Sequence, residues 1–212
     1  LSGVNTTVSG TVYIEGNAVT LPDTRQAINE GVSIIYQELN LVPYLSVAEN
    51  IFLGEAPRVA GIINWRKLYA DAQQILDRLH VNINSRQIVR KLGIAQQQMV
   101  EVAKALRHEA KVIIMDEPTS ALTDREITEL FATIKRLKDG GVGIIYISHR
   151  LEEVKQVGDR VTVLRDGKFV DTLFVKDSTM DQFIRLMVGR DITEKFPKEE
   201  VPIGEVILEV KN

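Results

Sequence analysis

One stretch of the sequence decides the fold: VIIMDEPTS, residues 112–120. It begins with an apolar run, residues 112–115, which is typical of a strand buried on both faces of a parallel sheet. Two carboxylates, Asp116 and Glu117, follow at the C-terminal end of that strand. Pro118 ends the strand, because proline has no N–H to offer the ladder of a sheet. The stretch therefore predicts a central strand of an α/β fold with acidic side chains at its carboxyl end.

The two adjacent carboxylates predict a ligand site. Two partly buried, ionised carboxylates side by side are costly unless a cation or a proton relieves them. In open α/β sheets, ligands also bind beyond the carboxyl ends of the strands. An aspartate that holds Mg²⁺ beside a glutamate that activates water fits both conditions. The alternative is a strand that ends in a solvated acidic turn, and the rest of the sequence has to decide between the two.

Composition excludes several classes of protein. The 212 residues are enough for one large domain. Charged residues make up 26% of the chain and the net charge is −3, so no basic surplus indicates a nucleic-acid partner. No apolar run approaches the ~18–20 residues that would span a bilayer, and no signal-peptide pattern is visible. The sequence has no cysteine, which fits a reducing compartment. We expect a cytoplasmic protein that meets a membrane through a partner.

The predicted elements follow one another in a mixed α/β order. Alternation predicts a hairpin over residues 8–19, and Pro22 suits the first turn of a helix that runs to Asn29. A strand that ends at Tyr36 follows, and residues 38–106 are predicted to be mostly helical, with a capping box at Ser46. Further along, we expect a helix over 123–139 capped by Thr123, a strand ending at 147, a hairpin over 161–170 and a helix ending at 189.

Three further segments carry a resemblance to a known family. Gln37 follows the apolar run at 32–36, LGIAQQQ at 92–98 opens a helix, and His149 follows an apolar strand. In this order the segments resemble the Q-loop, signature motif, Walker B strand, D-loop and H-switch of the ATPase domain of ATP-binding cassette (ABC) proteins. The resemblance is most specific in IIMDEPTSALTDRE and IYISHRLEEV. SIIYQELNLVPYLSVAENIFLG and QQQMVEVAKAL are similar to the ATP-binding subunits of bacterial sugar importers of the ribose, galactose and xylose type.

The resemblance implies both a fold and a set of roles. The fold is that of an ABC-type P-loop NTPase: α/β, with a mostly parallel sheet, antiparallel β elements and a helical subdomain at about residues 38–106. ATP and Mg²⁺ are the implied cofactors, with Asp116 and Gln37 at the metal. Glu117 would orient or deprotonate the attacking water, and His149 would contact the γ-phosphate, because phosphoryl transfer needs held phosphates and a positioned water.

Two short segments are implied to complete a nucleotide site. The signature segment consists of Leu92, Gly93, Ile94, Ala95 and Gln96, and the D-loop segment of Ser120, Ala121, Leu122 and Thr123. The common family signature is L-S-G-G-Q, so Gly93 stands where the family has a serine that donates to the γ-phosphate. Ile94 and Ala95 replace glycines that allow close backbone approach. We hypothesise that this composite site is the weaker one and that Gly93→Ser in the intact protein raises ATPase activity.

The resemblance also implies a domain organisation. Nothing in it matches G-x-x-x-x-G-K-[ST], the loop that cradles phosphates, and in the family that loop lies just upstream of a segment like residues 1–16. We therefore expect residues 1–189 to be a first ATPase domain that is incomplete at its N-terminus. By itself this fragment is expected to be inactive as an ATPase. Residues 190–203 are predicted to be a linker, and residues 204–212 to begin a second ATPase domain.

The implied partners are that second ATPase domain, the transmembrane permease subunits on the cytoplasmic face of the cell membrane and, indirectly, a periplasmic or extracellular sugar-binding protein. Two alternatives remain open. One is a cytosolic ABC ATPase without a permease, although the short interval between Gln37 and Leu92 leaves no room for the coiled-coil insertions of DNA-repair members. The other is a non-catalytic ABC-like binding module. Glu117 together with His149 argues against that module, since a structural remnant has no need of the pair.

Overall fold

The computed structural model describes residues 1–5, 9–108, 110–189 and 210. The chain divides into two units, Leu1–Gly158 and Asp159–Asn212, and each is considered by itself. The predicted linker at residues 190–203 and the predicted start of a second domain at 204–212 lie outside the described residues, apart from Val210. Both therefore stay predictions.

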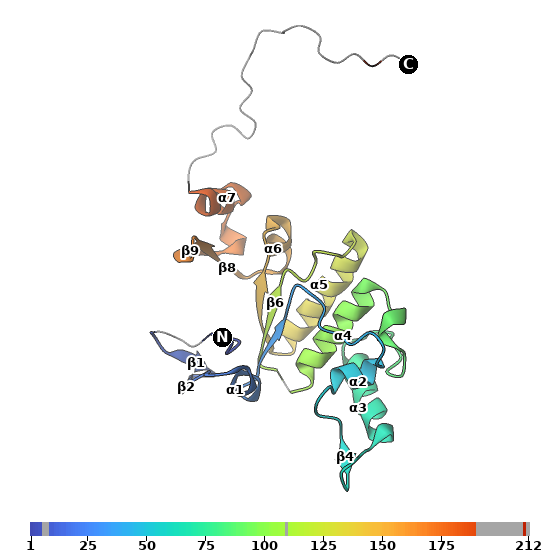
Figure 1. Ribbon diagram of the computed structural model, residues 1–212. Coiled ribbons are helices and arrows are strands. Elements are labelled where there is room, and N and C mark those ends of the chain that lie inside the picture. Colours follow the sequence, from blue (N-terminus) through green and yellow to red (C-terminus); the bar gives the residue numbers. More distant parts are fainter. Residues whose placement is uncertain (6–8, 109, 190–209, 211–212) are drawn as a thin grey trace. The chain divides into compact units, whose positions relative to one another are not determined.

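A parallel sheet forms the centre of the first unit. It has three strands, in the order β3 (Val32–Ile35), β6 (Val112–Asp116) and β7 (Gly143–Ile147), as Figure 1 shows. In the middle strand, Ile113, Ile114 and Met115 are all buried. The prediction of a central strand buried on both faces is confirmed, because β6 has a hydrogen-bonded neighbour on each side and apolar side chains on both faces.

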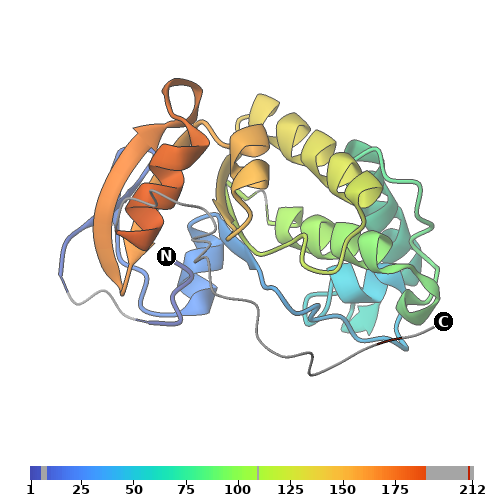
Figure 2. The same ribbon diagram turned by 90° about the horizontal axis from the view of Figure 1, so that it is seen from above.

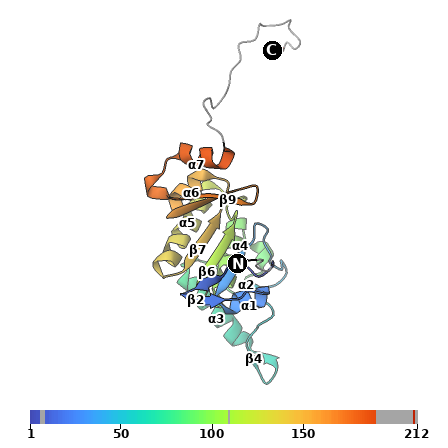
Figure 3. The same cartoon turned by 90° about the vertical axis from the view of Figure 1, so that its left-hand side faces the viewer.

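Two helices cover one face of this sheet. They are α4 (Ile94–Leu106) and α5 (Asp124–Asp139), which lie side by side in Figures 1 and 2. Figure 3 looks onto the opposite face, with β6 and β7 in front of the helices. Ile113 and Met115 share a buried cluster with Val100 of α4 and with Leu130 of α5. The α5 helix begins at Thr123, whose backbone N–H and hydroxyl both donate to Glu126, so the predicted capping box is confirmed.

A helical subdomain lies between β3 and β6. It contains α2 (Val47–Ile51), α3 (Trp65–Arg78) and η1 (Val89–Lys91), together with α4. The capping box at Ser46 is confirmed. The prediction of a mostly helical segment missed a small hairpin, β4 (Arg58–Val59) with β5 (Ile62–Ile63). Its turn places Ala60 and Gly61 at φ of 50° and 83°, and alanine at the first of these positions gives little sequence signal for such a turn.

The N-terminal part of the first unit forms a second, smaller core. The hairpin of β1 (Val12–Ile14) and β2 (Asn17–Val19) and the helix α1 (Thr24–Asn29) contribute to it. Asp23 is the N-cap of α1, since its side chain accepts from the N–H of Gln26 at 2.8 Å. Pro22 therefore lies just before the N-cap, outside the first turn of the helix for which it was predicted. The predicted hairpin is confirmed for its described residues.

The second unit consists of a hairpin and a helix. The hairpin pairs β8 (Arg160–Arg165) with β9 (Lys168–Phe174), and η2 (Val175–Asp177) leads to α7 (Met180–Val188). Asp166 and Gly167 turn the hairpin with φ of 52° and 72°, as predicted from the Asp-Gly pair. The α7 helix ends at Gly189, which has the left-handed conformation. None of the helices in the described part of the chain has the length and apolar character that a bilayer crossing requires.

Candidate functional site

The carboxyl ends of the three parallel strands position the candidate site. The last pairs of the two ladders are Ile35 with Met115 and Asp116 with Ile147. Gln37 and His149 each lie two residues beyond the last paired residue of β3 and of β7, and Glu117 directly follows β6. Because the carboxyl ends of parallel strands meet at one edge of a sheet, the three side chains come together there.

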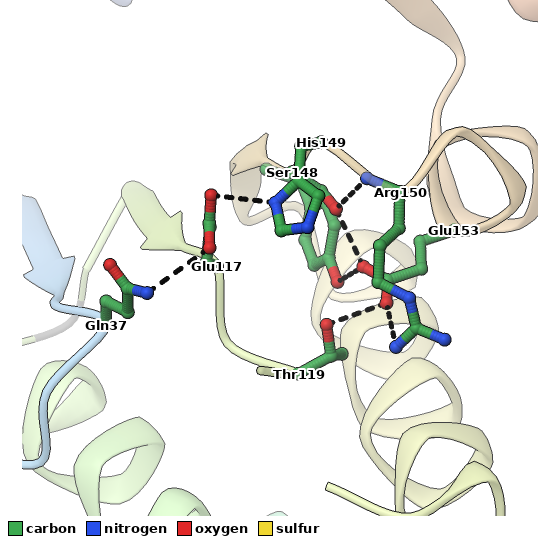
Figure 4. Close-up of polar contacts among 8 residues, drawn as sticks. Gln37, Glu117, Thr119, Ser148, His149, Arg150 and Glu153 are labelled. Atoms are coloured by element: carbon green, nitrogen blue, oxygen red, sulfur yellow. Dashed lines mark hydrogen bonds and ion pairs between the residues drawn. The ribbon is translucent and has the colours of Figure 1, made fainter. Parts of the chain in front are cut away.

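Glu117 is the centre of this group (Figure 4). One oxygen of its carboxylate, Oε1, lies 2.9 Å from Nδ1 of His149. The other, Oε2, accepts a hydrogen bond of 3.3 Å from the amide nitrogen of Gln37. The Glu117 side chain is 28% exposed and that of His149 is 70% exposed, so a ligand from solvent can reach the pair. Gln37 and His149, to which the resemblance assigns the metal and the γ-phosphate, thus both contact Glu117 at the acidic strand end, and their roles stay predictions.

The backbone of Glu117 is strained. Its φ is 43°, in the left-handed region that non-glycine residues rarely adopt, and the proline at position 118 further restricts the residue before it. The N–H of Glu117 donates to the carbonyl of Ile147 at 3.0 Å, which fastens the strained residue to the end of β7. Such strain is common at functional sites, where the surrounding structure holds a side chain in a set direction.

The residues predicted for the metal offer oxygen donors. Asp116 is the last residue of β6 and is half-buried. Gln37 uses its amide nitrogen toward Glu117, and its amide oxygen has no hydrogen bond within the described residues. No cluster of three or more His, Asp or Glu side chains that could hold a metal occurs among the described residues. A carboxylate and an amide oxygen still fit Mg²⁺, because this ion keeps several waters of its own.

The predicted signature segment forms the N-terminus of α4. Gly93 is the N-cap residue, and its N–H donates to the side chain of Gln96 at 3.2 Å. Leu92 is buried, whereas Ile94 is 49% exposed. The hydrogen bonds that Leu92, Gly93 and Gln96 make within the described part of the chain all lie inside this turn and the preceding one. No hydrogen bond in the described part of the chain joins residues 92–96 to Glu117, and their role stays a prediction.

The predicted D-loop segment forms a turn between β6 and α5. The N–H of Ser120 donates to the carbonyl of Glu117 at 3.3 Å, and that of Leu122 to the carbonyl of Thr119 at 3.1 Å. Ser120 and Ala121 are exposed, and Leu122 packs against the main core. This turn leaves the exposed residues available to a partner molecule.

A buried carboxylate near the site was not predicted from the sequence. Glu153, in the first turn of α6 (Leu151–Val157), is only 3% exposed. It accepts hydrogen bonds from the hydroxyls of Thr119 at 2.7 Å, Tyr146 at 2.8 Å and Ser148 at 2.9 Å. Arg150 lies 2.8 Å from the same carboxylate. Burial, and after it the hydrogen bond to Glu153, raises the pKa of the Tyr146 hydroxyl, which therefore stays protonated and donates.

Comparison with known proteins gives the family. A family model described as "ABC transporter" matches residues 1–120, more than half of the chain. The chain belongs to the ABC transporter family. The expected fold is thereby confirmed, and it agrees with solved ATP-binding cassettes. The crystal structure of the ADP conformation of MJ1267, an ATP-binding cassette of an ABC transporter, is 22% identical with a TM-score of 0.73, over 89% of this chain and 80% of that one.

Two relatives illustrate the subfamily. The chain is 47% identical, over its whole length, to the "Ribose import ATP-binding protein RbsA" of Corynebacterium glutamicum. It is 45% identical, again over its whole length, to the "Galactose/methyl galactoside import ATP-binding protein MglA" of Fusobacterium nucleatum. It covers 40% and 42% of these proteins. The chain therefore spans about two fifths of the length of the curated relatives that it matches, and the expected similarity to sugar importers is confirmed.

Proposed function

We propose that this chain is part of the energy-coupling subunit of an ABC importer for a monosaccharide, and that it contributes to hydrolysis of ATP. The contact of Glu117 with both Gln37 and His149 at the carboxyl edge of a parallel sheet carries the proposal. Relatives that are named as ribose and galactose import ATP-binding proteins support the substrate class.

The chemistry assigned to Glu117 follows from its surroundings. An ionised carboxylate that is partly exposed can accept a proton from a water molecule within hydrogen-bond reach. Its two oxygens are held from opposite sides by Gln37 and His149, so its direction is fixed before a water arrives. The left-handed backbone at Glu117 adds to this restraint. We assign Glu117 the role of orienting and deprotonating the attacking water.

The contact with Glu117 also determines how His149 can act. Because an ionised carboxylate only accepts, Nδ1 of His149 carries the proton that joins the two side chains. The Nε2 atom then faces away from this contact and has no hydrogen bond within the described residues. We propose that Nε2 binds a terminal phosphate oxygen, which requires a protonated ring at that moment. His149 would thus hold the terminal phosphate and the carboxylate of Glu117 at a fixed distance from each other.

Two cofactors follow from this assignment. ATP with Mg²⁺ would supply the phosphoryl group and neutralise its charge. We propose that Asp116, through a water, and the amide oxygen of Gln37 hold the ion, and that residues 92–96 and 120–123 face nucleotide across a dimer of ATPase domains. The proposed partners are a second ATPase domain of the same protein, the permease subunits and, indirectly, a sugar-binding protein. The proposed location is the cytoplasmic face of the cell membrane.

A glutamine substitution tests the proposal. Glu117→Gln should lower the rate of ATP hydrolysis by at least about 100-fold, as expected for loss of a general base. The affinity for MgATP should persist, because the substitution removes a proton acceptor and leaves the shape of the side chain. The matched control is Glu152→Gln, which removes an exposed carboxylate outside the site. Both variants are measured in the full-length protein, because the chain spans only part of its relatives.

The possible outcomes separate the competing functions. Hydrolysis by the wild type that Glu117→Gln abolishes and Glu152→Gln leaves unchanged supports an ATPase with Glu117 as its base. Hydrolysis that survives Glu117→Gln overturns the role of Glu117. A wild-type protein that neither binds nor hydrolyses MgATP overturns the ATPase proposal and favours a non-catalytic ABC-like module.

A further inference from the structure

A second carboxylate links the two segments that carry Glu117 and His149. The carboxylate of Glu153 is buried and has four close polar partners. Its Oε1 accepts from the hydroxyl of Thr119 and forms an ion pair with Nη1 of Arg150, and its Oε2 accepts from the hydroxyls of Tyr146 and Ser148. A carboxylate has about four acceptor positions, so the capacity of Glu153 is filled by these contacts.

The partners of Glu153 come from two different parts of the chain (Figure 4). Thr119 lies two residues after Glu117, is 2% exposed, and begins the turn that leads to α5. Ser148 directly precedes His149, and the hydroxyl of Ser148 also accepts from the N–H of Arg150 at 3.0 Å. A single buried carboxylate therefore bonds to the residues beside the general base and beside the histidine.

The site needs such a link, because the segment of Glu117 is under strain. The φ of 43° at Glu117 is maintained only while surrounding contacts hold the chain. The backbone bond from Glu117 to Ile147 restrains the residue from one side. Thr119 restrains the chain on the other side of Pro118 through its bond to Glu153. If Thr119 is released, the strained residue between these two restraints can relax.

From this geometry we propose that Glu153 is a positioning residue, which fixes the spacing of Glu117 and His149 by joining Thr119 to Ser148. The proposal rests on the proposed ATPase function for its catalytic consequence. Glu153 itself touches neither of the two side chains in the described contacts, so it acts on the reaction only through them. Positional errors near 1 Å in a catalytic group can lower rates by about 100-fold.

The first test replaces the carboxylate by an amide of the same shape. Glu153→Gln keeps one acceptor and introduces a donor, so at least one of the three hydroxyls loses its acceptor. In the full-length protein we expect the kcat for MgATP to fall at least about 10-fold with KM changed less than about twofold, as for an interaction needed beyond substrate binding. Glu152→Gln, which makes the same chemical change at an exposed position of the same helix, should leave both constants unchanged.

Hydrogen exchange provides a readout that does not depend on activity. In Glu153→Gln we expect faster amide exchange in residues 117–123 and 145–150, and unchanged exchange in α3, which belongs to the helical subdomain. Faster exchange throughout the first unit would indicate a general loss of stability and would overturn the positioning role.

A second pair of variants keeps the proposal testable if Glu153→Gln folds poorly. Thr119→Val preserves the shape of the side chain and removes its hydroxyl, whereas Thr119→Ser retains the hydroxyl. We expect Thr119→Val to reproduce the loss of kcat and the local increase in exchange, and Thr119→Ser to restore both to near the wild-type values. Equal behaviour of the two variants would overturn the proposed link.

These measurements distinguish the two proposals. Wild-type hydrolysis with an unchanged kcat in Glu153→Gln overturns the positioning role and leaves the ATPase function intact. If the wild type does not hydrolyse ATP, the proposed function fails, and exchange alone decides. Faster amide exchange in Glu153→Gln that is confined to residues 117–123 and 145–150 then supports the link through Glu153. Unchanged exchange in these two segments overturns it.

Discussion

The backbone N–H of Asn40 donates a hydrogen bond of 2.8 Å to the carboxylate of Glu101, which is buried in α4. Lys104, one turn further along, reaches the carbonyl of Asn40 at 3.1 Å and the carboxylate of Glu101 at 3.7 Å. The segment that follows Gln37 is thus fastened to the helix that begins at Gly93.

Removal of the Glu101 carboxylate should destabilise the chain. Glu101→Ala removes the acceptor of the Asn40 N–H, and a part-buried hydrogen bond of this kind contributes about 0.5–1.5 kcal/mol to the free energy of unfolding. Glu101→Gln retains a carbonyl oxygen at the same distance from the backbone and should cost less. Urea denaturation measures both, with Glu129→Gln as the control because its ion pair with Arg125 is exposed. Equal losses for alanine and glutamine would contradict the importance of this hydrogen bond.

Gly93→Ser should strengthen the start of α4. Gly93 has φ of −66° and ψ of 163°, ordinary N-cap values, and a side chain added there meets nothing within 4 Å. A serine hydroxyl can accept from the free N–H groups of the first turn, and serine exceeds glycine as an N-cap by a few tenths of a kcal/mol. Gly93→Ala adds a carbon without an acceptor and should be less stable than Gly93→Ser by about 1 kcal/mol. Thermal denaturation compares the three, and no difference between serine and alanine would contradict the cap.

The same substitution tests the hypothesis of a weaker composite site. If residues 92–96 face a γ-phosphate across a domain dimer, the hydroxyl of Gly93→Ser adds a donor to that phosphate. The rate of ATP hydrolysis by the full-length protein should then rise, while Gly93→Ala should not raise it. A rate that stays at the wild-type value in Gly93→Ser would count against the hypothesis, and the stability measurement would show separately whether the serine caps the helix.

Local patterns were sufficient for much of the fold. The capping boxes at Ser46 and Thr123 and the turn at Asp166 depend on residues within one turn of each other, so the sequence predicts them directly. The burial of β6 follows from its unbroken apolar run. The resemblance assigned Gln37, Glu117 and His149 to one nucleotide site, and the parallel register explains why the three side chains lie at the same edge of the sheet.

Contacts between distant residues were not predictable in this way. Glu153 occupies the first turn of a helix, where a glutamate is ordinarily a solvated charge that favours the helix dipole. Its burial depends on Thr119, which lies 34 residues earlier and shows no pattern that links the two. Glu101 likewise faces Asn40 across 61 residues. Such bonds follow from the packing of α4 and α6 rather than from local spacing, so they become visible only in three dimensions.

The stability of the first unit should depend on pH through His108. Desolvation by burial, and then the charge of Arg107, lowers the pKa of His108, and Glu55 opposes them. The unfolded chain therefore binds a proton at a higher pH than the folded chain, so stability is present above the ordinary value of about 6.5 and is lost as pH falls below it. His108→Gln should flatten this slope in urea denaturation between about pH 5 and 7. His80→Asn is the control, since His80 is exposed and asparagine tolerates its φ of 55°.

Glycine should be more stable than alanine at position 117. Both Glu117→Gly and Glu117→Ala remove the contacts with Gln37 and His149, so the two variants differ only in the added carbon. At ordinary positions glycine is less stable than alanine by about 0.5–1 kcal/mol, because it loses more backbone freedom on folding. At a φ of 43°, however, the carbon of alanine approaches the following carbonyl at a cost of about 1–2 kcal/mol.

The expected net difference is therefore between zero and about 1.5 kcal/mol in favour of Glu117→Gly, measured by urea denaturation of the two variants. The matched pair is Glu152→Gly and Glu152→Ala in the first turn of α6, where alanine should be the more stable. The same order at both positions would mean that residue 117 relaxes to negative φ once its side chain is removed. If glycine is the more stable at position 117 and alanine at position 152, then the left-handed backbone persists without the carboxylate. The bond to Ile147 and the contacts of Thr119 would then hold that backbone, as a fixed support for the general base requires.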